Sequence, residues 1–361
     1  MRGTVRQIRE TCYFILYILT RFRDFFYGIP DLPVPLSQAL FSNAHALSSH
    51  HLSVLLSVST QLIEGCPANL RAHFLPPMIS GLFGEFDRKI TLEWDAINKQ
   101  ISESGDNENL SDEMKTESIL RQLTYSTVSL VSALLDYQQL PGKYCIITRH
   151  TWHSLTNTDS PRNTQRQREQ SLWKFIVGTP QVLEPILMFC KNTIRVRDTR
   201  CVALVVRVLR STLVRFQEKS PIRDFYCIDI LQAAITSLHE PYFVDVQKDL
   251  AGLIAAIIHL DEDIPRSIIM SLPGMPDKAY RVDRKLAVLR GANQSERMQR
   301  SIVLDLLSSV RGVSIHEQGK IERAKPKKKT AVQEQYMSVD ERPTIIRGTS
   351  PGLAGVADMF S

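Results

Sequence analysis

The stretch RVRDTRCVALVVRVLRSTLVRFQ, residues 195–217, is the clearest helix in the sequence. At 100° per residue its apolar positions gather on one face, and they are Val202, Val205, Val206, Leu209, Leu213 and Phe216. The opposite face carries Arg197, Arg200, Arg207 and Arg215. Asp198 suits the first turn, where the helix end is positive. The pattern predicts a helix that packs on one side and meets solvent on the other.

The same helical period recurs along the chain, whereas few stretches alternate at a period of two. We predict helices near residues 4–27, 36–47, 50–64, 68–83, 85–103, 112–138, 165–177, 180–192, 195–217, 222–238, 243–260, 276–290 and 295–311. Antiparallel pairs of such helices are typical of HEAT and armadillo repeats. The predicted fold is therefore an all-α, HEAT/armadillo-type α-solenoid over residues 1–312. Residues 313–361 are predicted to be a mostly disordered basic tail, because the helical period fades there.

Composition narrows the class of protein. The chain has 361 residues, of which 43% are hydrophobic and 23% charged, so wholesale disorder and fibrous structure are excluded. Its six cysteines are scattered, which excludes a disulfide scaffold and indicates a reducing compartment, cytosol or nucleus. The formal net charge of +6 is mildly basic, so the location of the charge matters more than its sum.

An apolar run near the N-terminus, residues 12–19, follows a basic start. A secretory signal is conceivable, but Arg21 and Arg23 close the run and no small-residue cleavage site follows. Spanning a bilayer takes about 20 apolar residues, and this run has eight. We therefore expect a buried helix and no membrane insertion, with a targeting peptide as the alternative.

The sequence contains no recognisable catalytic or cofactor motif. GxGxxG, HExxH and CxxC are all absent. Cys145, His150 and His153 could be imagined as zinc ligands, but a second ligand pair is lacking. His50-His51 fits a helix face, and the acidic run at 261–263 fits a solvated loop. We expect a protein that is not an enzyme and needs no cofactor or metal.

Basic clustering is the positive signal. Residues 191–223 hold nine basic residues against two acidic ones, and residues 278–311 are also rich in basic side chains. Such stripes neutralise RNA phosphates or meet an acidic protein, although a solvated helix face is the plainer alternative. The candidate cargo- or phosphate-binding residues are Arg197, Arg200, Arg207 and Arg215. A second patch, typical of nuclear-localisation signals, comprises Lys325, Lys327, Lys328 and Lys329.

Several segments together resemble one family. HFLPPMISGLFGEFDRKITLEWDAINKQ (73–100), with its Pro-led helix running into Gly81-Leu82-Phe83, resembles the late repeats of exportin-5, the HASTY- and Msn5-type nuclear export receptors. An acidic gap and a long helix follow, as in that family. The closing PGLAGVADMF (351–360) is similar to its C-terminal ending. The resemblance covers about residues 30–312 and the tail end.

This resemblance implies a receptor of the karyopherin-β family that shuttles between nucleus and cytoplasm. The implied partners are Ran-GTP, structured RNA such as hairpins or tRNA, phosphoprotein cargo and nuclear pore proteins. Exportins of the family are much longer, and their Ran-binding N-terminal repeats have no counterpart here. The resemblance therefore implies a C-terminal portion, with Ran-GTP bound through other repeats. The alternatives are a HEAT-type scaffold or importin-like adaptor without RNA or Ran dependence, a helical enzyme, and a fragment without function of its own.

Overall fold

The computed structural model describes residues 2–103, 110–135 and 172–315, except 214, 217, 219, 262, 275–277, 292, 293 and 313. Within these ranges the regular structure is helical and no residue lies in a strand. The described helices belong to one compact unit, Met1–Gly319. The predicted all-α solenoid is confirmed, while the predicted tail from residue 316 onward lies outside the described residues.

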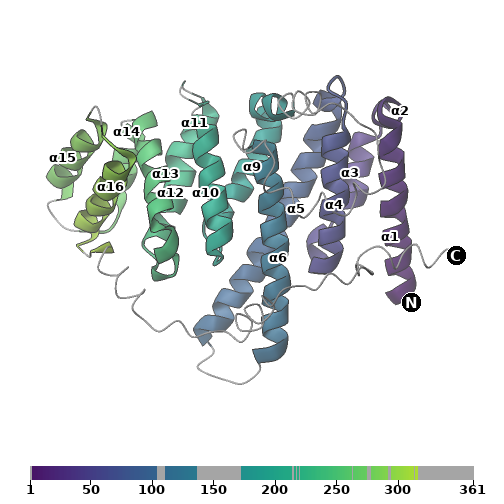
Figure 1. Ribbon diagram of the computed structural model, residues 1–361, viewed down its shortest axis with the longest axis horizontal. Helices are drawn as coiled ribbons and strands as arrows, with labels where there is room; N and C mark the ends of the chain where they lie inside the picture. Colours follow the sequence, from purple (N-terminus) through teal and green to yellow (C-terminus); the bar gives the residue numbers. More distant parts are fainter. Residues whose placement is uncertain are drawn as a thin grey trace, which may run out of the picture. The chain divides into compact units, whose positions relative to one another are not determined.

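Successive helices of this unit alternate between two layers (Figure 1). The first layer contains α1 (Arg2–Leu19), α4 (Ser49–Gly65), α6 (Leu110–Leu135), α10 (Thr199–Leu213), α13 (Gln247–Leu260) and α16 (Glu296–Arg311). The second contains α3 (Pro33–Phe41), α5 (Arg71–Glu103), α9 (Pro180–Thr193), α11 (Pro221–Phe225), the π-helix η5 (Tyr226–Ile230), α12 (Leu231–Leu238), α14 (Asp263–Ser271) and α15 (Lys278–Arg290). Short connecting helices are η1 (Thr20–Phe22), α2 (Arg23–Tyr27), η2 (Ala44–Ala46), η6 (Pro241–Val246) and one over 172–178.

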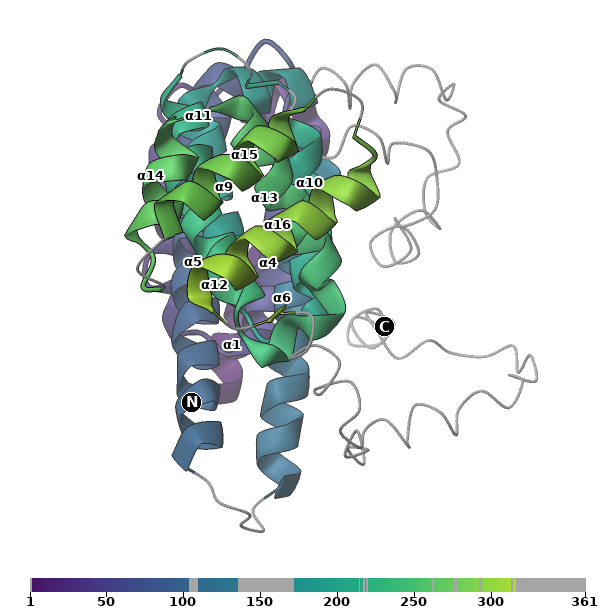
Figure 2. The ribbon, with the colours of Figure 1, turned by 90° about the vertical axis from the view of Figure 1, so that its left-hand side faces the viewer.

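Contacts run both along and between the layers. In the first layer α1 packs on α4, α4 on α6, α6 on α10, α10 on α13 and α13 on α16. Pairs such as α4 with α5, α12 with α13 and α15 with α16 join the layers, and Figure 2 looks along the stack from α14, α15 and α16. Helices within the stack therefore bury their apolar faces against neighbours on both sides, as in a solenoid.

Side-chain caps fix where several helices begin. The hydroxyls of Ser48, Ser220 and Ser295 accept backbone N–H groups in the first turns of α4, α11 and α16. Such caps satisfy N–H groups that have no partner within the helix. Gly312, at φ 74°, ends α16 in the left-handed conformation that glycine adopts without strain.

One prediction was wrong at α5, where the two predicted helices 68–83 and 85–103 are a single helix. Gly84, which lies at the predicted break, is mid-helix and exposed. A glycine there costs only about 1 kcal/mol of helix propensity. The fully buried Phe83 and Phe86 on either side hold the helix together by packing.

The predicted bounds of α10 also need correction. The predicted helix 195–217 is shorter, Thr199–Leu213, so Arg197 and Arg215 flank it. Of the predicted apolar face, Val202, Val205, Val206, Leu209 and Leu213 are buried, whereas Phe216 lies beyond the helix and is partly buried. Cys201, Val208 and Thr212 are buried as well, because α10 packs against α6, α9 and α13 together.

No helix was predicted at α14, because its acidic start was read as a solvated loop. The Oδ1 atom of Asp261 accepts the N–H groups of Asp263 and Ile264, both at 3.1 Å, and so begins this helix. Asp261 of the acidic run is therefore a helix cap.

The first helix is helical as predicted, but its burial was overestimated. Tyr13 is buried, whereas Phe14, Ile15 and Ile18 are 41–49% exposed and Phe25 of α2 is 83% exposed. α4 covers one side of α1, and no described helix covers the other. Among the described residues no helix is long and apolar enough to cross a bilayer.

Candidate functional site

Asp198 is a buried carboxylate at the start of α10, with 2% of its side chain exposed. Its Oδ1 atom accepts the backbone N–H groups of Arg200 at 3.0 Å and of Cys201 at 3.2 Å. These bonds cap the helix and explain why α10 begins at Thr199. A buried carboxylate also needs a cation, because burial without one is costly.

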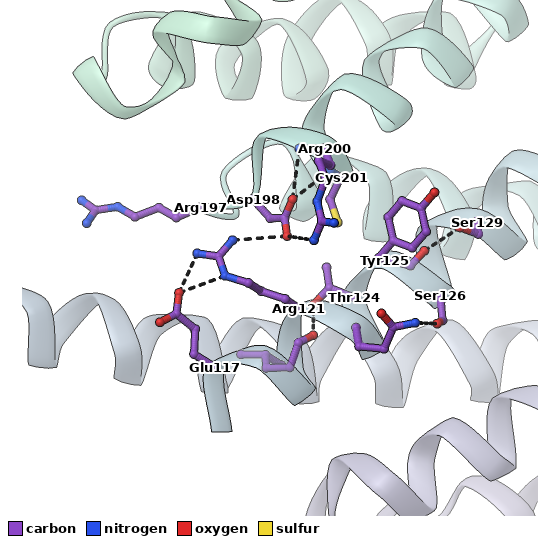
Figure 3. A network of polar contacts seen from close by, with 12 residues as sticks. Glu117, Arg121, Thr124, Tyr125, Ser126, Ser129, Arg197, Asp198, Arg200 and Cys201 are labelled. Carbon is purple, nitrogen blue, oxygen red and sulfur yellow. Dashed lines mark hydrogen bonds and ion pairs between the residues drawn. The ribbon is translucent and has the colours of Figure 1, made fainter. Parts of the chain in front are cut away.

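Arg121 of α6 supplies that cation (Figure 3). Its Nη1 donates to Oδ2 of Asp198 at 3.2 Å, while Nε and Nη2 donate to Glu117, one turn earlier, at 2.9 and 2.6 Å. The guanidinium lies over the Trp94 ring of α5, 5.0 Å from its centroid. Burial is the largest single influence and lowers the pKa of Arg121, but the hydrogen bond to Glu117, together with the interactions with Tyr242 and the Glu117 charge, raises that pKa above its ordinary value. The cation is therefore fixed in place and stays charged.

Arg200 lies on the solvent side of this network, with 68% of its side chain exposed. Its guanidinium is 3.6 Å from Oδ2 of Asp198 and 5.7 Å from the centroid of the Tyr125 ring on α6. Figure 3 shows α10 and α6 contributing these side chains from opposite sides of the network. Two contacts therefore orient the guanidinium of a side chain that remains mostly exposed to solvent.

Arg197 precedes α10 and meets a different aromatic residue. Its guanidinium lies 5.7 Å from the centroid of the Tyr242 ring of η6. The Tyr242 hydroxyl donates to the carbonyl oxygen of Arg197 at 2.8 Å. The ring is 40% exposed, so the pair forms part of the surface beside Asp198.

The four predicted arginines do not form one helix face. Arg200 meets Arg121 at Asp198, whereas Arg197 points away from them and lies over Tyr242. Arg207 is exposed farther along α10. Arg215 lies beyond the end of α10, 4.9 Å from the centroid of the Trp173 ring. The second predicted patch, Lys325, Lys327, Lys328 and Lys329, lies outside the described residues.

Sequence reasoning missed Arg121, Tyr125 and Tyr242. Arg121 lies 77 residues from Asp198 in the chain, and no local pattern signals that pairing. The only usable hint was the lone acid Asp198 before an arginine-rich helix, because a buried acid implies a distant cation.

Other candidate chemistry finds no support in the described ranges. They contain no group of three or more His, Cys, Asp or Glu residues placed to hold a metal, and the zinc candidates Cys145, His150 and His153 lie outside them. Burial raises the pKa of the Cys66 thiol to about 12 and that of Cys227 to about 11. Both thiols are therefore protonated and unreactive near neutral pH.

The sequence also matches a known protein family. Residues 1–322 match the sequence profile of the Exportin-5 family. The chain belongs to the Exportin-5 family. Exportins are transport receptors and not enzymes.

The chain also matches three curated relatives at low identity. The chain is 28% identical to a Schizosaccharomyces pombe protein named only as uncharacterized, over 85% of this chain. It is 22% identical to Exportin-5 of Dictyostelium discoideum over 88% of this chain, and 19% identical to Protein MSN5 of Saccharomyces cerevisiae over 90%. It spans only 25–26% of the length of these relatives. No solved structure matches the chain significantly.

Proposed function

We propose that this chain is a cargo-facing segment of a nuclear export receptor that binds structured RNA, a hairpin or a tRNA. Its arginine surface, defined as Arg121, Arg197, Arg200 and Arg207, meets the phosphates of the RNA backbone. Other repeats of the receptor bind Ran-GTP, and the receptor contacts nuclear pore proteins as it moves between nucleus and cytoplasm. Family membership supports the export role.

The observation that carries this proposal is the exposed Arg200 guanidinium above a fixed ion pair. Asp198 is buried and pairs with Arg121, which also pairs with Glu117, while Arg200 keeps 68% of its side chain in water. A guanidinium that is already oriented loses less side-chain entropy when it binds a phosphate bidentately. Duplex recognition needs phosphate and 2′-hydroxyl contacts rather than stacking platforms.

Charge reversal on α10 tests the proposal. In Arg200→Glu/Arg207→Glu, affinity for a short RNA hairpin should fall at least about tenfold, because two phosphate contacts become repulsive. A matched control is Arg281→Glu/Arg284→Glu, which makes the same charge change at exposed positions of α15 in the second layer. Affinity is measured by fluorescence anisotropy, with circular dichroism to confirm that each variant is folded.

Equal losses in both double variants would contradict the assignment of the surface, because they would reflect net charge alone. Arg200→Gln/Arg207→Gln guards against a different artefact, repulsion between Asp198 and the glutamate introduced at position 200. That variant should weaken RNA binding less than the reversal but more than the α15 control.

A second candidate function is a HEAT-repeat scaffold that binds proteins, phosphorylated cargo included, without RNA or Ran dependence. One observation favours it, namely that the arginines have aromatic partners inside the chain. Arg197 lies over Tyr242, Arg200 over Tyr125 and Arg215 over Trp173. Cation–π contacts of this kind stabilise a fold by about 0.5–1 kcal/mol each at exposed sites. Hairpin RNA that fails to bind, together with protein partners indifferent to the nucleotide state of Ran, would favour the scaffold.

A further inference from the structure

A second cluster of arginines joins three successive helices of the first layer, α10, α13 and α16. Glu296, the first residue of α16, accepts hydrogen bonds from Arg210 of α10 and, at 2.7 Å, from Arg300 of α16. Two guanidinium groups thus share one carboxylate. The cluster carries a net positive charge at the surface.

Gly252 of α13 forms the floor of this cluster. A Cβ atom there would lie 3.1 Å from Nε of Arg300 and 3.2 Å from Nη1 of Arg210. Both guanidinium groups therefore rest on the backbone of α13, a closeness that the absent side chain allows. This explains how arginines from α10 and α16 reach each other across the helix between them.

Solvent reaches the shared carboxylate more readily than the arginines. The side chain of Glu296 is 52% exposed, against 30% for Arg210 and 27% for Arg300. The two arginines pack against the backbone of α13 at Gly252, while the side chain of Glu296 is the most exposed of the three. This is the arrangement of an anion site with a replaceable internal occupant.

We propose that Arg210 and Arg300 form a phosphate site, normally filled by Glu296, that binds a phosphate of the RNA backbone. This rests on the proposed function and extends the arginine surface from α6 and α10 to α16. An extended polyanion fits better than a single phosphorylated side chain, because exposed arginines recur on both flanking helices. Arg207 lies one turn before Arg210, and Arg297 lies one turn before Arg300.

Neutralising Glu296 tests the site directly. Glu296→Gln should tighten hairpin RNA binding about three- to tenfold, because the phosphate no longer competes with a resident carboxylate. The matched control is Asp305→Asn, which removes one negative charge from the same helix at a carboxylate paired with Lys285 of α15. Arg210→Gln should weaken binding in both the wild-type and the Glu296→Gln background.

A second readout does not depend on RNA. Pyrophosphate should raise the melting temperature of Glu296→Gln more than that of the wild type, and Arg210→Gln should abolish the difference. Equal RNA affinities and equal pyrophosphate shifts in Glu296→Gln and Asp305→Asn would overturn the site.

The outcomes for the site and for the proposed function are distinguishable. If Glu296→Gln changes nothing while Arg200→Glu/Arg207→Glu loses RNA binding, the site fails and the proposed function stands. If the wild type binds no RNA, the proposed function fails, and the RNA ligand assigned to this site fails with it. Tighter binding of a phosphopeptide alone by Glu296→Gln would overturn RNA as the ligand.

Discussion

At the scale of single residues, the carboxylate of Asp198 has two structural roles. Its Oδ1 caps α10 and its Oδ2 pairs with Arg121 of α6. The buried acid therefore fixes both where α10 begins and how it is placed against its neighbour. Arg200, the exposed member of the network, takes its position from the same carboxylate.

Asp198→Ala should lower the free energy of unfolding by about 2–4 kcal/mol, because it removes the cap and one partner of a buried ion pair. Asp198→Asn keeps an oxygen for the cap and should lose about half as much. Urea unfolding monitored by circular dichroism measures both. Equal stabilities for the two variants would show that the cap contributes nothing, and a wild-type value for Asp198→Ala would contradict the network.

At the scale of helices, α5 shows how packing overrides local propensity. Two of its glycines differ in their surroundings. At Gly81 a Cβ atom would lie 2.7 Å from Cδ2 of Phe41 and 2.7 Å from Oγ of Ser37 in α3, whereas at Gly84 it would meet nothing within 4 Å. Gly81 therefore permits the close crossing of α3 and α5, and Gly84 has no such role.

Gly81→Ala should destabilise the chain by about 1–3 kcal/mol through overpacking. Gly84→Ala, the control in the same helix, should stabilise it by about 0.5–1 kcal/mol, because alanine favours the helix. Thermal unfolding of the two variants compares them directly. A loss of stability in Gly84→Ala would instead support separate helices that end at residue 83 and begin at residue 85.

The helices were largely predictable because each has an apolar face with a period of 3.6 residues. Their joints were less so. The break expected at Gly84 depends on a glycine penalty of about 1 kcal/mol, and the helix missed after Asp261 depends on a cap of similar energy. Energies this small are easily misjudged from sequence. The arginine surface was only half predictable, since Arg197 and Arg200 stand out in the sequence but Arg121, Tyr125 and Tyr242 belong to other helices.

At the scale of the whole compact unit, two alternating layers bring these elements together. The network around Asp198 draws on α5, α6, α10 and η6, and the Arg210–Glu296–Arg300 cluster joins α10 to α16 across α13. Both lie on helices of the first layer, apart from Trp94 and Tyr242. Binding by such a surface needs no catalytic group, which suits a transport receptor.

The most direct test of RNA binding is a salt titration of hairpin affinity with the whole chain, with and without GTP-loaded Ran. We expect a slope of log K on log salt of about −2 to −4, as when a few arginines each neutralise one phosphate. Ran should leave this slope unchanged, because in our account Ran binds other repeats. Affinity that does not change with salt, or no binding at low salt, would contradict an RNA-facing arginine surface.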